Sequence, residues 1–160
     1  MIIINNYEKL IIEADQEGLT AKEAPLQAYD GRIKDNKIAI REDIPTQKQK
    51  ACVLAEELGH HYTTVGDILD QDDVSNRKQE LRARAWAYDK MIGLTGLIRA
   101  YKHGCRNRFE VAECLDVTEE FLEEGLEYYR NRYGICTKLD NYVIYFIPHL
   151  MVADMNYIIK

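Results

Sequence analysis

Apolar residues recur at helical spacing near the start of the chain. Tyr7, Leu10, Ile11 and Ala14 recur three or four positions apart, and Gly18 follows them. Residues at this spacing share one face of a helix, and a glycine commonly ends a helix. The pattern therefore predicts an amphipathic opening helix.

A second helix is predicted from its start signal as well as from its spacing. In "TQKQ", Thr46 and Gln49 stand three apart, as the two partners of a capping box do. The apolar positions that follow recur every three or four residues, so one face of this helix is expected to be buried. That face comprises Ala51, Leu54, Ala55, Leu58 and Tyr62.

A third helix is predicted over residues 76–92, with Ser75 as its N-terminal cap and Gly93 at its end. One stripe of this helix carries larger apolar side chains together with one alanine: Leu81, Ala85, Tyr88 and Ile92. The neighbouring stripe carries the small residues Ala83 and Ala87. Since small side chains leave little bulk between two backbones, we expect another helix to approach closely there.

The period changes to two between the first and second helices. Ile38 and Ile40 alternate with polar residues, and Ile33 precedes a tight reversal near Asp35 and Asn36. This pattern predicts a β-hairpin. Its Lys and Arg residues would lie on the outward face, which suits an exposed sheet edge.

The last third of the chain is predicted to be a helical lobe followed by a strand. A short helix from about Phe109, a turn at Asp116, a cap at Thr118 and a longer helix ending at Gly134 precede a strand over residues 141–148. The packing residues of the lobe would be Val111, Leu115, Val117, Phe121 and Leu122.

The acidic charge of this lobe argues against DNA binding, although its order of elements is similar to a helix-turn-helix. Residues 113–127 contain no Lys or Arg. Phosphates would repel such a surface. Two interpretations stay open, a packed structural lobe and a docking surface for a basic partner. The acidic residues are Glu113, Asp116, Glu119, Glu120, Glu123, Glu124 and Glu127.

Composition narrows the class of protein further. The 160-residue chain has a net charge of -6, so a broad nucleic-acid-binding surface is not expected. Its four cysteines form no Cys-x-x-Cys pair, and Asn5, Asn6 and Glu8 interrupt the apolar N-terminus too early for a signal peptide. We therefore expect a cytoplasmic protein with reduced thiols.

The second helix carries residues that suit a metal site. Glu56 and His60 are four apart, so both side chains can reach one ion from the same face. Glu80, twenty residues after His60 on the next helix, is the candidate for the third ligand. Glu57 would stay off the metal and act as a general base.

Other interpretations of these residues remain open. Glu57 and His61 are also four apart and could form a pair on the adjoining face, but that choice would leave no obvious base. A Glu and a His at this spacing often make only an exposed contact along a helix. Glu80 could likewise be a solvated partner of Arg84.

Two stretches resemble the ImmA/IrrE-type metallo-endopeptidases, "LAEELGHHY" (residues 54–62) and "ELRARAWA" (residues 80–87). The resemblance implies an α+β fold. Its mostly helical, gluzincin-like minimal metallopeptidase core (1–104) would carry a small hairpin or sheet, followed by a helical lobe with a terminal strand (105–160). It also implies zinc, Glu80 as third ligand, an edge strand that holds extended substrate, and cleavage of a repressor that silences a phage or other mobile element.

One position departs from the family's His-Glu-x-x-His motif, because Glu56 stands where the first His is expected. Carboxylate oxygen binds zinc well, but a second carboxylate ligand offsets more of the ion's charge and makes it a weaker Lewis acid. Harder ligands also favour Mn²⁺ or Fe²⁺ relatively more. Two functions are therefore weighed, a metal-dependent peptidase that acts on a specific protein and a pseudopeptidase that binds and sequesters the same partner.

Overall fold

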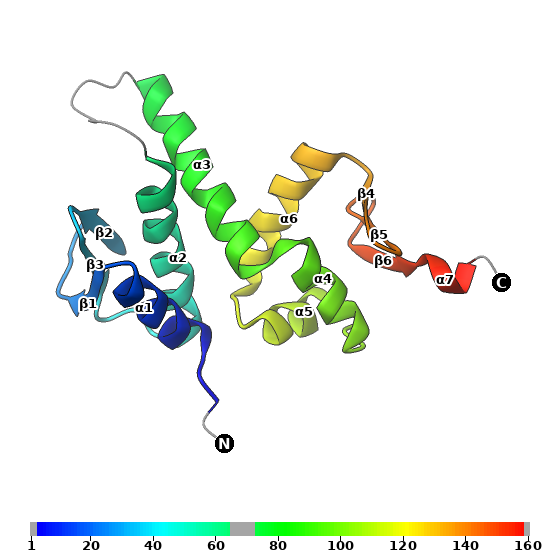
Figure 1. Cartoon of the computed structure of the whole chain (residues 1–160), viewed down its shortest axis with the longest axis horizontal. Coiled ribbons are helices and arrows are strands. Elements are labelled where there is room, and N and C mark those ends of the chain that lie inside the picture. Colours follow the sequence, from blue (N-terminus) through cyan, green and yellow to red (C-terminus); the bar gives the residue numbers. More distant parts are fainter. Residues whose placement is uncertain (1–2, 65–72, 159–160) are drawn as a thin grey trace. The chain divides into compact units, whose positions relative to one another are not determined.

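The computed structural model describes residues 3–64 and 73–158, and the chain divides into two compact units, residues 1–90 and residues 91–160 (Figure 1). The first unit contains α1 (Asn6–Gln16), β1 (Thr20–Ala24), β2 (Gly31–Lys34), β3 (Lys37–Arg41), α2 (Gln47–Thr63) and nearly all of α3 (Asp73–Met91). The second contains α4 (Gly93–Lys102), α5 (Arg108–Leu115), α6 (Glu119–Tyr133), β4 (Cys136–Leu139), β5 (Tyr142–Tyr145), β6 (Met151–Asp154) and α7 (Met155–Ile158). The fold is α+β and mostly helical, as the sequence predicted.

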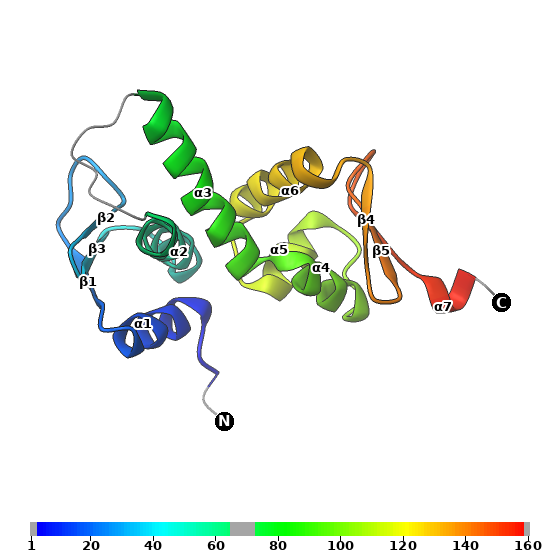
Figure 2. The same cartoon turned by 45° about the horizontal axis from the view of Figure 1, so that its top comes forward.

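The sheet of the first unit has the order β1-β3-β2. The predicted hairpin is β2 and β3, which pair antiparallel around Asp35, a residue with φ of 54°. Ile38 and Ile40 are buried, and α2 packs against both β2 and β3 (Figure 2). The sequence did not predict β1, which pairs with β3 in parallel. Since β3 lies in the centre, β2 and β1 are the two edges of this sheet.

The predicted start signal of α2 forms, and α1 begins with the same kind of motif, which was not predicted. In α2, the Thr46 side chain accepts from the backbone N–H of Gln49 at 3.2 Å, and the Gln49 side chain accepts from the N–H of Thr46 at 3.2 Å. Asn5 and Glu8 make the same reciprocal pair in α1. Such caps satisfy backbone donors that a helix otherwise leaves without partners. The cap at Thr46 fixes the residue at which α2 begins.

The structure corrects three details of the predicted helices. Ser75 is not a cap, because α3 begins at Asp73 and already includes it. Leu81 is 67% exposed, so it is not a core residue. Tyr62 is also wrong as a core position, since it is 42% exposed and stacks on Trp86 with ring centroids 5.0 Å apart. In contrast, Ala83 and Ala87 are fully buried, as expected for a close helix contact.

The second unit combines α4, α5 and α6 with an antiparallel sheet of order β4-β5-β6. The lobe packs as predicted, and its five expected core residues are all buried. β5 lies within the predicted terminal strand, whereas α4, β4 and β6 were not predicted. The boundary between the compact units also differs from the predicted division after residue 104, because α4 packs with α5 and the second sheet.

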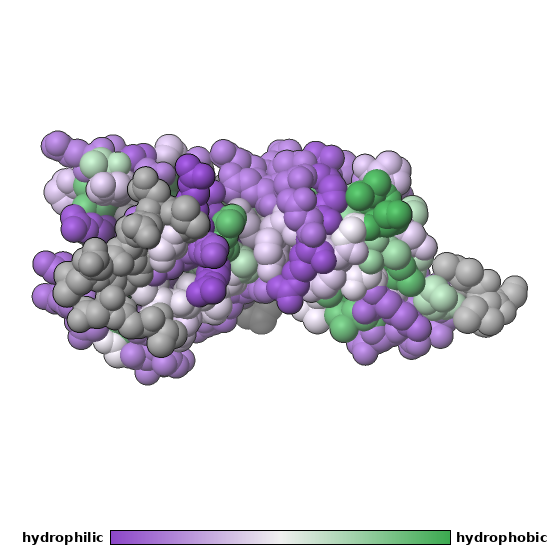
Figure 3. Space-filling view, turned by 90° about the horizontal axis from the view of Figure 1, so that it is seen from above, coloured by the Kyte–Doolittle hydropathy of each residue, from purple (hydrophilic) through white to green (hydrophobic). Residues whose placement is uncertain are grey.

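Apolar side chains gather on one part of the surface of the second unit. Figure 3 shows apolar atoms gathered over the end of the second unit that carries its sheet, while much of the rest of this face is hydrophilic. The exposed large apolar side chains of this unit include Ile135, Ile147 and Met151. Within the described part of the chain, no helix has the length and apolarity that a membrane span requires.

Candidate metal and catalytic site

Two faces of α2 have different tasks. Ala51, Leu54, Ala55 and Leu58 are buried in the unit's core, which fixes the rotation of the helix. Glu56, Glu57 and His60 lie on the partly exposed side. The core face therefore determines where the polar side chains point.

The crossing of α2 and α3 is unusually close at Gly59. A Cβ atom added to Gly59 would lie 2.2 Å from the backbone oxygen of Ala83. No real Cβ can approach an oxygen that closely, so only glycine permits this backbone-to-backbone contact. The small residues expected to allow close approach, Ala83 and Ala87, are both fully buried. The crossing brings the residues that follow Gly59 next to the early part of α3.

The close crossing places His60 beside Glu80. The Nε2 atom of His60 and the Oε2 atom of Glu80 are 3.2 Å apart, and both side chains remain partly exposed. The other oxygen of Glu80 accepts from Nε of Arg84 at 3.3 Å. Glu80 is thus a partner of Arg84, as the simpler interpretation held, and also a partner of His60 across the two helices.

Glu57 lies between these helices and strand β2. A Cβ atom on Gly31 would lie 2.9 Å from Cγ and 3.0 Å from Oε1 of Glu57, so the glycine makes room for this side chain. The pKa of Glu57 is raised to about 7. Burial is the largest cause, the charges of Glu56 and Glu80 raise the pKa as well, and a hydrogen bond with the Ile33 backbone partly lowers it. A carboxyl group in this state can accept and release a proton near neutral pH.

The position of Glu56 differs from that of the other two predicted ligands. Its charge acts on Glu57, so its carboxylate lies near the site. Across residues 3–64 and 73–158, however, no group of three or more His, Cys, Asp or Glu side chains is arranged to hold a metal ion. The structure brings His60 and Glu80 together, whereas Glu56 as the third ligand stays a prediction.

The alternative pair on α2 is less well supported by the geometry. His61 is exposed and meets the ring of Tyr62 edge-on, at 5.0 Å between centroids. The histidine that contacts Glu80 is His60. Glu57 is turned toward β2 instead of toward a ligand pair with His61. These contacts favour the register in which Glu57 remains available as a base.

The donor types present fit a divalent metal at two positions. Imidazole nitrogen and carboxylate oxygen are both common zinc ligands, and His60 and Glu80 supply one of each. Three carboxylates close enough to influence one another, those of Glu56, Glu57 and Glu80, also concentrate negative charge that a bound cation would offset. His60 and Glu80 would hold the metal, with Glu56 as the predicted third ligand.

Sequence reasoning missed two residues that shape this site. Gly31 was given no role in the site, yet its lack of a side chain accommodates Glu57 and Val53. Ile33 was interpreted only as a strand residue, yet its backbone bonds to Glu57. The one available signal was a glycine at the first position of the strand, which can indicate a close approach of another element.

Comparison with known proteins agrees with these residues. No curated protein and no solved structure matches the chain. A family model does match, over residues 14–127, and it describes the IrrE N-terminal-like domain of peptidase family M78. The match includes α2, α3 and every residue of the candidate site, and it covers well over half of the chain. The chain therefore belongs to the IrrE N-terminal-like peptidase family.

Proposed function

We propose that this protein is a metal-dependent endopeptidase that cleaves a specific partner protein. The observation that supports this most directly is the carboxyl group of Glu57, held between edge strand β2 and the His60–Glu80 pair. A proton-accepting group, metal-ligand side chains and a free strand edge within one small region are what peptide hydrolysis needs.

The proposed ligands are Glu56, His60 and Glu80. A metal bound there would supply Lewis-acid chemistry by polarising the carbonyl of the peptide bond. Zinc is the metal that the family resemblance implies. Manganese and iron are alternatives, because a site with two carboxylates and one imidazole is harder than the usual zinc set.

Glu57 is the proposed general base and acid. Its carboxylate would take a proton from the attacking water and later give that proton to the amine that leaves. The hydrogen bond with the Ile33 backbone and the contact with Gly31 hold the side chain in one orientation. The core face of α2 and the contact at Gly59 restrict how far the helix beneath it can shift.

Strand β2 is the proposed binding edge for substrate. Among the described residues it pairs with β3 alone, so an extended peptide could add to its other side as a further strand. The proposed substrate is a helix-turn-helix repressor of a phage or other mobile element, in the cytoplasm. That identity rests on the resemblance of "LAEELGHHY" and "ELRARAWA" to ImmA/IrrE-type enzymes.

Co-expression with the repressor encoded beside it tests this function. The repressor should disappear with the wild-type protein and persist with Glu57→Gln, because that change removes the proton acceptor and keeps the shape of the side chain. Glu42→Gln is a matched control, since Glu42 is an exposed glutamate outside the site. Equal loss of repressor with wild type and Glu57→Gln would remove the claim of enzymatic activity.

A pseudopeptidase that sequesters the same partner is the second candidate. The feature that favours it is Glu56, which replaces the histidine of the usual motif and would weaken a bound ion as a Lewis acid. Glu56→His separates the two. A gain in metal retention or in cleavage would mean that the natural residue lowers the activity. Intact repressor that co-purifies with the wild-type protein, with no fragments in zinc, manganese or iron, would favour sequestration.

A further inference from the structure

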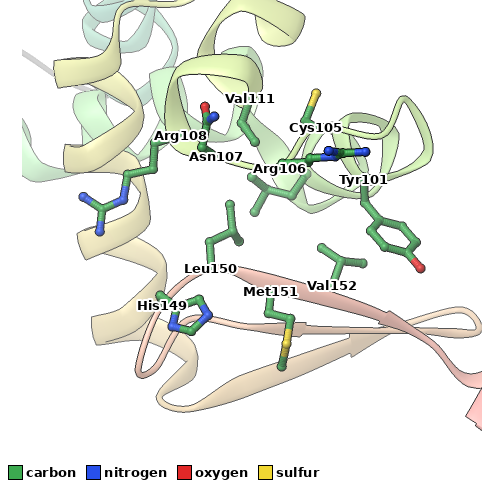
Figure 4. Close-up of a pocket in the computed structure, with 11 residues that line it drawn as sticks. Tyr101, Cys105, Arg106, Asn107, Arg108, Val111, His149, Leu150, Met151 and Val152 are labelled. Atoms are coloured by element: carbon green, nitrogen blue, oxygen red, sulfur yellow. The ribbon is translucent and has the colours of Figure 1, made fainter.

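The second unit contains a cavity that the proposed peptidase site does not use. It lies between the α4–α5 corner and strand β6, and its volume is about 480 Å³ (Figure 4). Small-molecule pockets in proteins typically enclose roughly 300–1,000 Å³. The cavity is therefore large enough for a small organic molecule.

Most of the cavity wall is apolar. Leu97 and Val111 contribute from the helices, and Leu150 and Val152 project toward them from the strand side (Figure 4). Leu97 and Val111 are buried, so they form a fixed wall. An aliphatic chain placed here would leave water, and the burial of its apolar surface would favour binding.

The polar side of the cavity carries positive charge and no carboxylate. Its lining includes Arg106, Arg108 and His149, but no Asp or Glu. Arg108 forms an ion pair with Glu123 and extends toward α6. Arg106 has no ion-pair partner among the described residues, so its guanidinium is the cation available to a ligand.

The backbone around Arg106 is held in place by the start of α5. Its N–H donates to Oε2 of Glu110 at 2.6 Å, and Asn107 caps the helix by accepting from the N–H of Glu110 at 2.9 Å. The neighbouring Cys105 adds no negative charge, because burial, the nearby Cys114 thiol and the charge of Glu110 raise its pKa. A cation on a fixed backbone beside an apolar cavity is suited to an anionic headgroup.

We propose that this cavity binds a small amphipathic carboxylate, an aliphatic acid whose carboxylate pairs with Arg106 and whose chain lies against Leu97, Val111 and Leu150. The lining supports an anion over a cation, because it contains three basic side chains and no acidic one. The requirement for an apolar body follows from the wall opposite Arg106. An acidic peptide segment is the competing occupant.

Calorimetric titration of the full chain with octanoate tests the proposal. Octanoate should bind saturably, whereas octylammonium and octan-1-ol, with the same chain length, should bind at least about tenfold more weakly, since a charge-assisted hydrogen bond contributes this much or more. Equal binding of octanoate and octan-1-ol, or no saturable binding of octanoate, would overturn the proposal. So would binding of an acidic peptide with no binding of octanoate.

Three variants locate the site. Arg106→Gln should weaken octanoate binding about tenfold or more, while Arg99→Gln, which removes an exposed cation of α4 outside the cavity, should not. Leu150→Trp should block binding by filling the cavity. Equal affinity in the Arg106 and Arg99 variants would place the ligand elsewhere. Repressor cleavage is not involved in these measurements, so they stand or fall separately from the peptidase proposal.

Discussion

The two units each contain a buried helical glycine at a helix contact, and the two contacts differ in kind. At Gly59, a missing Cβ atom faces the backbone of Ala83, at 2.2 Å from its oxygen. At Gly96, it faces only the end of the Leu115 side chain, at 3.3 Å from Cδ2. A side-chain tip can move by a few tenths of an ångström, whereas a helix backbone cannot move without its whole helix.

This difference shows which of the two helix contacts fixes the residues of the candidate site. The Gly59 contact fixes the relative positions of α2 and α3, and the next residue, His60, lies 3.2 Å from Glu80 across that contact. The Gly96 contact only completes a hydrophobic core around Leu115. Small residues in the first unit therefore position polar groups, while those in the second fill space.

Alanine substitutions at Gly59 and Gly96 should give the largest contrast in the free energy of unfolding. Gly59→Ala should lower the free energy of unfolding by about 3 kcal/mol, because the new methyl group overlaps a backbone oxygen. Gly96→Ala should change it by less than about 1 kcal/mol, since slight crowding of Leu115 is offset by the better helix propensity of alanine. Chemical denaturation of both variants checks this, and similar losses would contradict the contrast.

Gly31→Ala adds a methyl group that should disturb the candidate site more than the stability of the fold. It would meet Cγ1 of Val53 at 2.7 Å and Cγ of Glu57 at 2.9 Å, both of which belong to side chains that can move. The displacement of Glu57 should lower the rate of repressor cleavage by roughly tenfold to a hundredfold, because small shifts of a catalytic group cost that much. A rate within twofold of wild type would mean that the position of Glu57 is not critical.

A change in the second unit should affect stability alone. Tyr129 is fully buried, and its hydroxyl accepts a hydrogen bond from the backbone N–H of Gly93 at 3.1 Å. Tyr129→Phe should lower the free energy of unfolding by about 1–2 kcal/mol, since it leaves a part-buried donor without this partner. Metal content and cleavage should stay at wild-type levels, and a loss of either would show that the units are coupled.

The smallest effect at neutral pH is expected at Tyr7. Its hydroxyl donates to Oε1 of Glu23 at 3.3 Å, and burial together with the charge of Glu23 raises the Tyr7 pKa to about 12. In the unfolded chain the pKa is about 10, so this stabilisation is present below pH 10 and is lost as the pH rises toward 12. Tyr7→Phe should remove that part of the pH dependence, which denaturation of both proteins at pH 9 and pH 11 would measure. Identical pH dependence would contradict it.

Local sequence signals were reliable where one stretch of chain determines the structure. The capping box at Thr46 and the helix cap at Thr118 form as the pattern predicts, whereas the capping box at Asn5 was not predicted. The small-residue stripe of α3 also predicted a close crossing correctly. The stripe of larger apolar residues on α3 is only partly buried, since Tyr88 and Ile92 are buried but Leu81 is exposed.

Elements stabilised by distant partners were harder to predict. Strand β1 has no buried residue within its span and gains its order from parallel pairing with β3. Helix α4 contains two glycines, which have low helix propensity, and its buried face packs on α5 and the second sheet. Likewise, the sequence predicted Glu57 as the base, but it could not indicate that Gly31 and Ile33 would contact its side chain.

Metal content of the untagged protein tests the central claim most directly. Elemental analysis after growth with added zinc should find about one ion per chain, as a catalytic zinc site of three protein ligands holds. His60→Gln should lose most of that metal, whereas His61→Gln, which alters the exposed neighbouring histidine, should retain it. Equal metal content in the two variants, or none in the wild-type protein, would contradict a metal site formed by His60 and Glu80.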